Sequence, residues 1–331
     1  LLLVAAINFY SVAFDYGYNI FLYSMVTVFF NLLFPYLVSL FSFEEKDERT
    51  LGVLLCIMLV VGVWQYVAVN VLYGVEYLYD NERIKSPLFH GEARIPSIFV
   101  SANNFSIFLI TCLSYILFVS RAGGIVKSVA TFVVAIFIYY TYVRKSYVLL
   151  LMLLLYFTYN FIFRGVSWKV KFGAIFISLL LVIVTLAFMN GYSSDGLLST
   201  QTLESRAAQW EFYFSRLLGA GLINFLFGGF ILQSSFESLG FYFEFLDNNL
   251  LMVLMFGGFL FFLAYVCLLL SLLSVYIRNY HLSPGWAAFG IFSFVSVIWV
   301  GLFSNVIDNH EVSVVLMTSM WLSYRKLSVL K

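Results

Sequence analysis

The chain has 331 residues, of which 63% are hydrophobic and only 11% are charged, whereas about a quarter of an ordinary soluble domain is charged. With 38 Phe and 23 Tyr residues, it carries more apolar surface than a water-soluble core of this length can bury. These proportions exclude a soluble globular protein and indicate that the main solvent is lipid. The formal net charge of +1 says little about partners, and we expect no nucleic-acid partner.

The apolar residues form long continuous runs, such as YVLLLMLLLYF and GAIFISLLLVIVTLAF. A membrane β-barrel would alternate apolar and polar residues, so the runs predict an all-α, polytopic transmembrane helical bundle. At about 20 residues per span we count about ten spans, and expect about 10–12 in all. They cover approximately 1–14, 19–41, 51–73, 98–119, 126–142, 147–163, 171–190, 249–276, 285–304 and 311–324, and part of 217–232 is a further candidate for a span or a re-entrant element.

Residues 1–331 read as a single integral membrane domain, and we expect a truncated N-terminus because the first residue is Leu1 and not Met. No internal repeat is visible. The three Cys residues all lie inside apolar runs, which is typical of packing residues rather than of disulfides or metal ligands. There is no Walker loop, dinucleotide fingerprint or convincing metal-ligand spacing, so we expect no metal and no cofactor.

The distribution of Lys and Arg predicts the orientation, because cytoplasmic loops carry the excess of positive charge. With the connection 121–127 in the cytoplasm, eleven of the 18 Lys and Arg residues fall on the cytoplasmic side. Residues 191–248 then form one large extracytoplasmic loop, on the same side as the shorter loop 74–97. Basic residues beside apolar runs on that side are costly unless an anion meets them, so together they predict an anion-binding surface; singly, each equally fits an arginine or lysine snorkelling to headgroups.

One polar stretch on the outer side stands directly before and within the start of a span. Arg94 precedes that span, and Asn103 and Asn104 follow in its first turns, with Pro96 expected in the first helical turn. Polar side chains at this depth face protein or a wet cavity rather than lipid. We assign Arg94, Asn103 and Asn104 to substrate binding; the alternative is hydrogen bonding between helices.

A second basic stretch, Arg144 and Lys145, forms a tight turn between two predicted spans on the outer side. The turn is too short to carry these charges far into water, so an anion would stabilise them there. We assign both residues to substrate binding. The alternative is a misassigned cytoplasmic turn, because basic turns are commoner on that side.

The large loop contains a helical pattern in which Arg206, Trp210 and Tyr213 share one face, followed by Arg216. An amphipathic helix at the membrane interface would present these groups to a lipid-linked substrate. We assign Arg206 to catalysis and the other three residues to substrate binding. The alternative is an interfacial helix that only anchors the loop.

Three further candidates for catalysis carry a carboxylate or an imidazole. Glu244 and Asp247 stand directly before a long apolar run, where Asp247 would either accept a proton from a hydroxyl or cap the following helix. Capping is the commoner role for Asp at such a position. His310 lies beside Glu311 in a short outer connection, and a lone His of this kind is more often structural than catalytic.

These segments, in this order, resemble the Wzy polymerase and O-antigen ligase superfamily of bacterial envelope polysaccharide assembly. The resemblance covers about residues 90 to 265 and rests on short motifs. They are Arg94 before an Asn-rich span start, the basic turn at 144–146, Ser205-Arg206 with Trp210 four residues on, the LFGGF stretch, and Asp247-Asn248-Asn249 before a span with Gly257-Gly258. Ligases of the superfamily have a His at the end of the large loop, where this chain has Asp247, which favours a polymerase.

The resemblance implies a metal-independent glycosyltransferase in the bacterial inner membrane, crossing it several times. Its substrate would be an undecaprenyl-diphosphate-linked oligosaccharide, bound by the outer arginines at the outer face, with Asp247, Glu244 or His310 as base. A flippase and a chain-length regulator are the expected protein partners, besides membrane lipid. The alternatives are an O-antigen ligase and a non-enzymatic transporter of lipid-linked oligosaccharides; transporters tend to show the internal repeats that this chain lacks.

Overall fold

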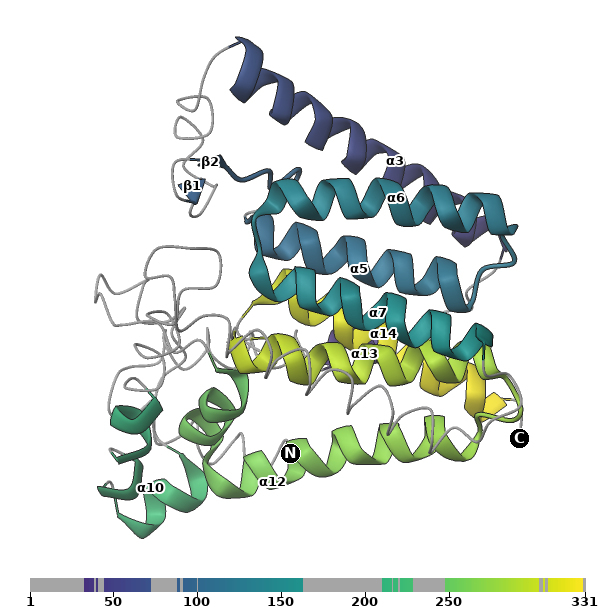
Figure 1. Cartoon of the computed structure of the whole chain (residues 1–331). Coiled ribbons are helices and arrows are strands. Elements are labelled where there is room, and N and C mark those ends of the chain that lie inside the picture. Colours follow the sequence, from purple (N-terminus) through teal and green to yellow (C-terminus); the bar gives the residue numbers. More distant parts are fainter. Residues whose placement is uncertain are drawn as a thin grey trace. The chain divides into compact units, whose positions relative to one another are not determined.

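The computed structural model describes residues 33–38, 40, 45–72, 88–89, 92–99, 101–162, 210–215, 217–219, 221–228, 248–303, 306 and 309–329. Most of these residues are helical (Figure 1). The chain forms two compact units: unit 1 consists of Leu1–Ser39 with Ser178–Lys331, and unit 2 of Leu40–Ile177. Each unit has its own set of packed helices.

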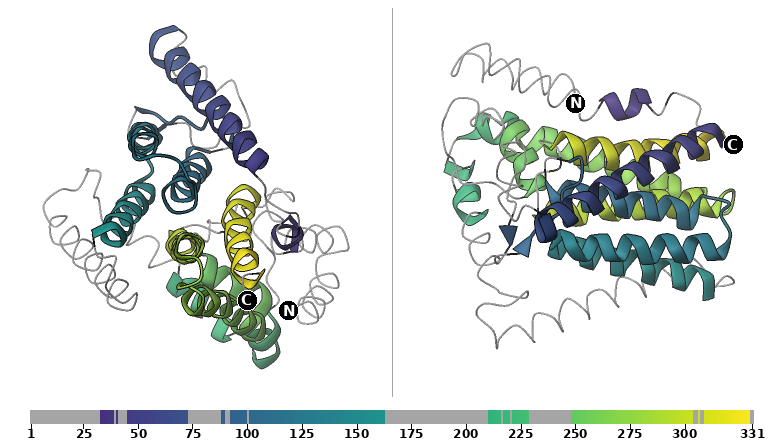
Figure 2. Two further views of the ribbon diagram at one scale, coloured as in Figure 1. Left: turned by 90° about the vertical axis from the view of Figure 1, so that its right-hand side faces the viewer. Right: turned by 90° about the horizontal axis from the view of Figure 1, so that it is seen from above.

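Unit 2 is built mainly from four long helices in its described part. The elements are α3 (Glu45–Val67), the π-helix η1 (Ala68–Leu72), the strands β1 (Leu88–Phe89) and β2 (Glu92–Ala93), α5 (Ala102–Phe118), α6 (Gly124–Thr141) and α7 (Arg144–Ile162). The two strands pair antiparallel, with Leu88 opposite Ala93. Helices α5, α6 and α7 run side by side, whereas α3 lies oblique to them (Figure 1 and Figure 2).

Burial in unit 2 follows the position of each helix in the bundle. Helix α5 contacts both α6 and α7, and its residues Phe105, Leu109 and Leu113 are completely buried. The outer faces of α3 and α6 instead expose large apolar side chains such as Val60 and Phe132. Such faces suit lipid tails as the surrounding solvent.

Unit 1 contains α10 (Leu222–Phe227), α12 (Asn249–Arg278), α13 (Pro284–Phe303) and α14 (His310–Val329), with a further helical stretch at 210–215. Helix α13 packs against both α12 and α14. The buried Tyr276 hydroxyl of α12 donates to the Met320 carbonyl of α14 at 2.7 Å. Three helices thereby form one bundle, because this hydrogen bond ties together the two helices that flank α13.

Four described helices are long and apolar enough to cross a membrane: Gly52–Leu72, Gly124–Thr141, Asn249–Arg278 and Pro284–Phe303. The apolar helix Ala102–Phe118 is one residue short of 18 and is completely surrounded by its neighbours over much of its length. The chain is therefore an all-α, multi-pass membrane protein, as its composition predicts.

Seven of the ten expected spans coincide with described helices, namely α3 with η1, α5, α6, α7, α12, α13 and α14. The expected spans 1–14 and 171–190, and most of 19–41, lie outside the described residues. The candidate span within 217–232 contains α10, whose six residues are about 9 Å long and cannot cross a membrane. Pro96 is not in the first turn of α5, because that helix begins at Ala102 after the N-cap Ser101.

Helix α12 is sharply kinked at Gly258, which has φ 67° and ψ −176°. The amide of Asn249, in the first turn, donates to the hydroxyl of Tyr265 at 3.2 Å. In a straight helix, 16 residues would separate these two positions by about 24 Å, so the kink folds the first part of α12 back toward the second. Gly228, at the end of α10, fits into this kink, where a Cβ would overlap the carbonyl oxygen of Phe256.

We expect Gly228→Ala and Gly258→Ala each to lower the free energy of unfolding by about 3 kcal/mol or more, since both residues have positive φ and neither has room for a Cβ. Thermal melting of the purified full chain in detergent measures this. Gly219→Ala is the matched control, because nothing lies within 4 Å of a Cβ at that position. Equal melting temperatures for Gly258→Ala and the parent would show that the α10–α12 contact does not form.

Candidate functional site

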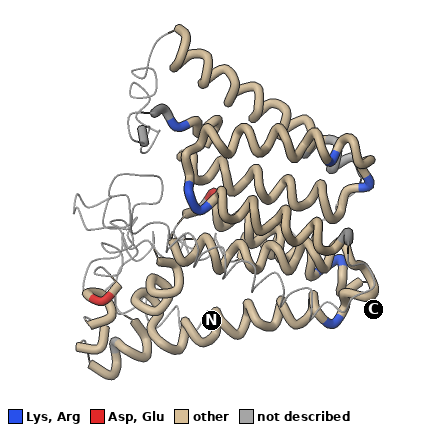
Figure 3. Tube along the Cα trace, in the orientation of Figure 1, with Lys and Arg blue, Asp and Glu red and all other residues tan. Residues whose placement is uncertain are grey.

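In the described part of the chain, Lys and Arg residues lie near helix ends rather than along the helices (Figure 3). In unit 1, Arg278 ends α12 and Lys326 lies in the last turn of α14, where its Nζ is 5.8 Å from the ring centre of Trp286 at the start of α13. In unit 2, Arg121 and Lys127 lie at the connection between α5 and α6. Separation of charge to helix ends agrees with spans that cross an apolar layer.

The opposite end of unit 2 carries Arg94, which is fixed to the end of α6. Its Nε donates to the carbonyl oxygen of Thr141 at 3.2 Å, and the N–H of Ile95 donates to the carbonyl of Tyr140 at 3.3 Å. These carbonyls belong to the last turn of α6, where the helix dipole favours a positive charge. The contact places Arg94 directly beside the α6–α7 turn, although 47 residues separate Arg94 from Thr141.

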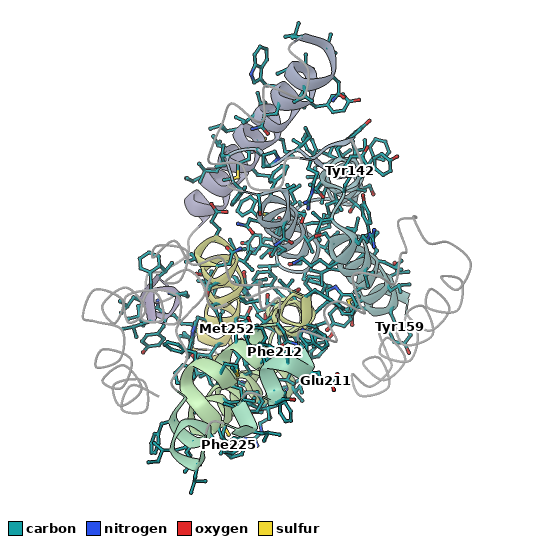
Figure 4. All side chains as sticks on the ribbon, turned by 90° about the vertical axis from the view of Figure 1, so that its left-hand side faces the viewer. Tyr142, Tyr159, Glu211, Phe212, Phe225 and Met252 are labelled. Atoms are coloured by element: carbon teal, nitrogen blue, oxygen red, sulfur yellow. The ribbon has the colours of Figure 1, made fainter. Side chains whose placement is uncertain are left out.

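The α6–α7 turn itself brings two further cations to this end. Tyr142 ends α6 in the left-handed conformation, with φ 51°, and α7 starts at Arg144 two residues later. Figure 4, in which Tyr142 is labelled, views the structure from this side. Arg144 and Lys145 are half-buried in the first turn of α7, so the turn predicted to be basic and tight is confirmed as such.

The starts of α5 and α7 are joined by a buried pair of hydroxyl groups. The Oγ atoms of Ser106 and Ser146 are 2.6 Å apart. Ser106 Oγ also donates to the Asn103 carbonyl at 2.8 Å, so the hydroxyl of Ser146 must be the donor in the pair. The two helices therefore have their N-terminal ends, with the positive ends of their dipoles, close together.

Two Asn side chains occupy the first turn of α5. Asn104 is buried, and its backbone N–H donates to the Oγ of the N-cap Ser101 at 3.3 Å. The Oδ1 atom of Asn103 is buried and accepts no hydrogen bond in the described part of the chain. The alternative role for polar residues at this helix start is hydrogen bonding between helices, and Ser106 takes that role. Asn103 retains an acceptor that a bound hydroxyl would satisfy.

The charge of Arg94 is held in a partly desolvated position at this end of unit 2. Burial lowers the pKa of its guanidinium from the ordinary value, and the nearby Tyr147 acts in the opposite direction. Desolvation thus destabilises the charged form, and a bound anion would offset that cost. Its hydrogen bond to Thr141 uses Nε alone, so the two terminal nitrogens, which fit the oxygens of a phosphate, donate to no partner among the described residues.

Five of the predicted binding residues are therefore gathered at one end of unit 2: Arg94, Asn103, Asn104, Arg144 and Lys145. We call them the basic end of unit 2. Sequence spacing alone does not predict this cluster, because its members come from three segments of the chain. Among described groups of His, Cys, Asp and Glu, none has the grouping that holds a metal ion.

Trp210 and Tyr213 lie in unit 1, in the helical stretch 210–215. Both are partly buried, while Phe214 is exposed, as are Glu211 and Phe212, which are labelled in Figure 4. The prediction that Trp210 and Tyr213 share one helix face is confirmed by this pattern. The Nε1 atom of Trp210 is buried and has no hydrogen-bond acceptor in the described part of the chain.

The other predicted site residues are not placed by the structure. Arg206, Arg216, Glu244 and Asp247 lie outside the described residues. His310 is described only as the first residue of α14, and its side chain is not. Their assignments to catalysis and binding stay predictions from the sequence.

The start of α12 corrects one prediction and adds a connection that sequence reasoning missed. The N-cap is Asn248, whose side chain accepts from the Leu251 N–H at 3.0 Å, and not Asp247. The next residue, Asn249, accepts from the Val306 N–H at 3.1 Å through Oδ1. This bond ties the first turn of α12 to the connection that leads into α14.

Comparisons with known proteins give no relative for this chain. No protein-family model matches it, and no curated protein and no solved structure is significantly similar to it.

We expect Ser106→Ala to lower the free energy of unfolding more than Ser146→Ala, because it leaves the donating hydroxyl of Ser146 buried without an acceptor. The coupling between the two changes should be about 0.6–1.7 kcal/mol, the range for hydrogen bonds between membrane helices. Melting of both single variants and the double variant in detergent measures it. Ser128→Ala, at an exposed position on α6, should melt with the parent; strictly additive losses would exclude the hydroxyl pair.

Proposed function

We propose that the protein is a polysaccharide polymerase of the bacterial inner membrane, which transfers the growing glycan from undecaprenyl diphosphate to a lipid-linked repeat unit. The proposal combines the family resemblance of the sequence with the basic end of unit 2. The single observation that carries it is the position of Arg94, which is held by Thr141 beside the turn that bears Arg144 and Lys145. A half-buried cluster of cations at the edge of an apolar layer suits the diphosphate of a lipid carrier.

The reaction needs a group that stabilises the departing diphosphate. The acceptor hydroxyl attacks the anomeric carbon, a new glycosidic C–O bond forms, and the bond from that carbon to the diphosphate oxygen breaks. The diphosphate leaves with the electron pair, and its growing negative charge is stabilised by guanidinium and ammonium groups and by the N-terminal ends of α5 and α7. Arg94 contributes a planar fork that matches two phosphate oxygens.

The acceptor side needs a base that removes the hydroxyl proton. We assign this role to Asp247, Glu244 or His310, with Arg206 and Arg216 as additional phosphate ligands and Trp210 and Tyr213 as platforms for sugar rings. The Trp210 indole N–H, which lacks an acceptor among the described residues, is a suitable donor to a sugar hydroxyl. In this proposal the reaction takes place at the outer face of the membrane, and a flippase supplies the substrate.

We expect Arg94→Ala to reduce polymer formation by about 10²–10³-fold, the usual effect of removing one group that stabilises a leaving charge. Arg94→Lys should also be strongly impaired, because a lysine keeps the charge but loses the planar fork and the Nε bond to Thr141. Arg206→Ala should likewise abolish chain extension. The measurement is the ladder of surface glycolipid in a strain that lacks the gene and expresses each variant.

Arg121→Ala is the matched control, since Arg121 is an exposed arginine at the α5–α6 connection. It should leave the ladder unchanged at equal protein level in the membrane. In the deletion strain, loss of the ladder with a remaining single-repeat band supports a polymerase, whereas accumulation of lipid-linked polymer indicates a ligase. A normal ladder in well-expressed Arg94→Ala would exclude the proposed diphosphate site, and a normal ladder in the deletion strain would favour the transporter.

A further inference from the structure

A glutamine inside the first described span holds a residue that lies far away in the sequence. Gln65 lies in α3, within the apolar helix Gly52–Leu72, and only 8% of its surface is exposed. Its Nε2 donates to the carbonyl of Ser97 at 2.8 Å, and its Oε1 accepts from the N–H of the same residue at 2.7 Å. One side-chain amide thus satisfies both backbone groups of a residue 32 positions away.

Ser97 needs this support because its backbone is strained. It has φ 54°, which is unfavourable for a residue other than glycine, and it is 95% buried. Its hydroxyl donates to the Met58 carbonyl of α3 at 2.7 Å. Three hydrogen bonds from a single helix therefore keep Ser97 in a conformation that it would otherwise leave.

The same short segment carries Arg94. Segment 94–99 is bonded to α3 through Ser97 and to the end of α6 through Arg94 and Ile95. Only Pro96, whose ring fixes its own φ, stands between the bonded residues Ile95 and Ser97. A change at the Ser97 attachment is therefore passed through this stiff residue to the bonds that hold Arg94 on α6.

We propose that Gln65 is a positioning residue, which acts through Ser97 to aim the Arg94 guanidinium at the diphosphate of the lipid carrier. This inference rests on the proposed function. It gives α3 a part in substrate binding, although none of the proposed site residues lies on α3. Loss of the clamp frees segment 94–99 at Ser97 while the charge of Arg94 is kept. Gln65 itself does not touch the substrate.

Binding of undecaprenyl diphosphate to the purified full chain in nanodiscs tests the proposal. We expect Gln65→Leu to raise the Kd by about ten- to hundredfold, the usual effect of misplacing a binding group. Asn70→Leu is the matched control, since it removes an exposed amide of η1 whose bond among the described residues is to the Tyr66 carbonyl one turn earlier. Its Kd should stay within about twofold of the parent's.

A double-mutant cycle separates positioning from general stability. If Gln65 acts through Arg94, then adding Gln65→Leu to Arg94→Ala should change the Kd by less than about twofold. An equal loss in both backgrounds, or an unchanged Kd for Gln65→Leu alone, would overturn the inference while the diphosphate site stands. A parental Kd for Arg94→Ala would instead overturn the proposed function, and the positioning role with it.

A variant with a shorter side-chain amide tests the same proposal if Gln65→Leu does not accumulate in the membrane. Gln65→Asn keeps a polar side chain but is one methylene too short to reach both groups of Ser97 at the observed distances. A Kd raised about tenfold or more is again expected for this variant. A parental Kd for Gln65→Asn would contradict the two-point clamp.

Discussion

Backbone groups that leave water for an apolar layer must find hydrogen-bond partners inside the protein, and this constraint governs unit 2. Most of its chain meets the requirement by forming helices. Segment 94–99 is not helical, and its polar groups are instead satisfied by the Gln65 side chain and by the last carbonyls of α6. The irregular conformation that carries Arg94 is therefore stable only because two helices supply those partners.

The same constraint explains where the site residues gather. Carbonyls at the end of α6 and N–H groups at the starts of α5 and α7 have no partners within their own helices. Arg94 satisfies one such carbonyl, and the hydroxyls of Ser106 and Ser146 join the two helix starts. The helix ends that are costly to leave unpaired are thus the places where charged and polar side chains gather.

Sequence reasoning predicted the helices well and the contacts between them poorly. Long apolar runs identify α6 and α13 almost to the residue, because only a helix hides the backbone from lipid. The start of α5 was placed four residues too early, since the turn at 96–99 has an equally apolar composition. Gln65 was missed because a single amide in an apolar run gives no periodic signal, and its partner Ser97 is identified only by the fold.

The candidate site shows the same division. The basic character of 144–145 and the shared face of Trp210 and Tyr213 follow from local spacing, whereas the contact between Arg94 and Thr141 depends on how α6 packs.

The kink in α12 also determines which part of that helix is needed to cross the membrane. After Gly258, residues 259–278 form a helix about 30 Å long, which equals the hydrocarbon thickness of a bilayer. Residues 259–278 alone are therefore long enough to cross the bilayer, and the nine residues before Gly258, with α10 packed on them, form a separate element at the end of that span.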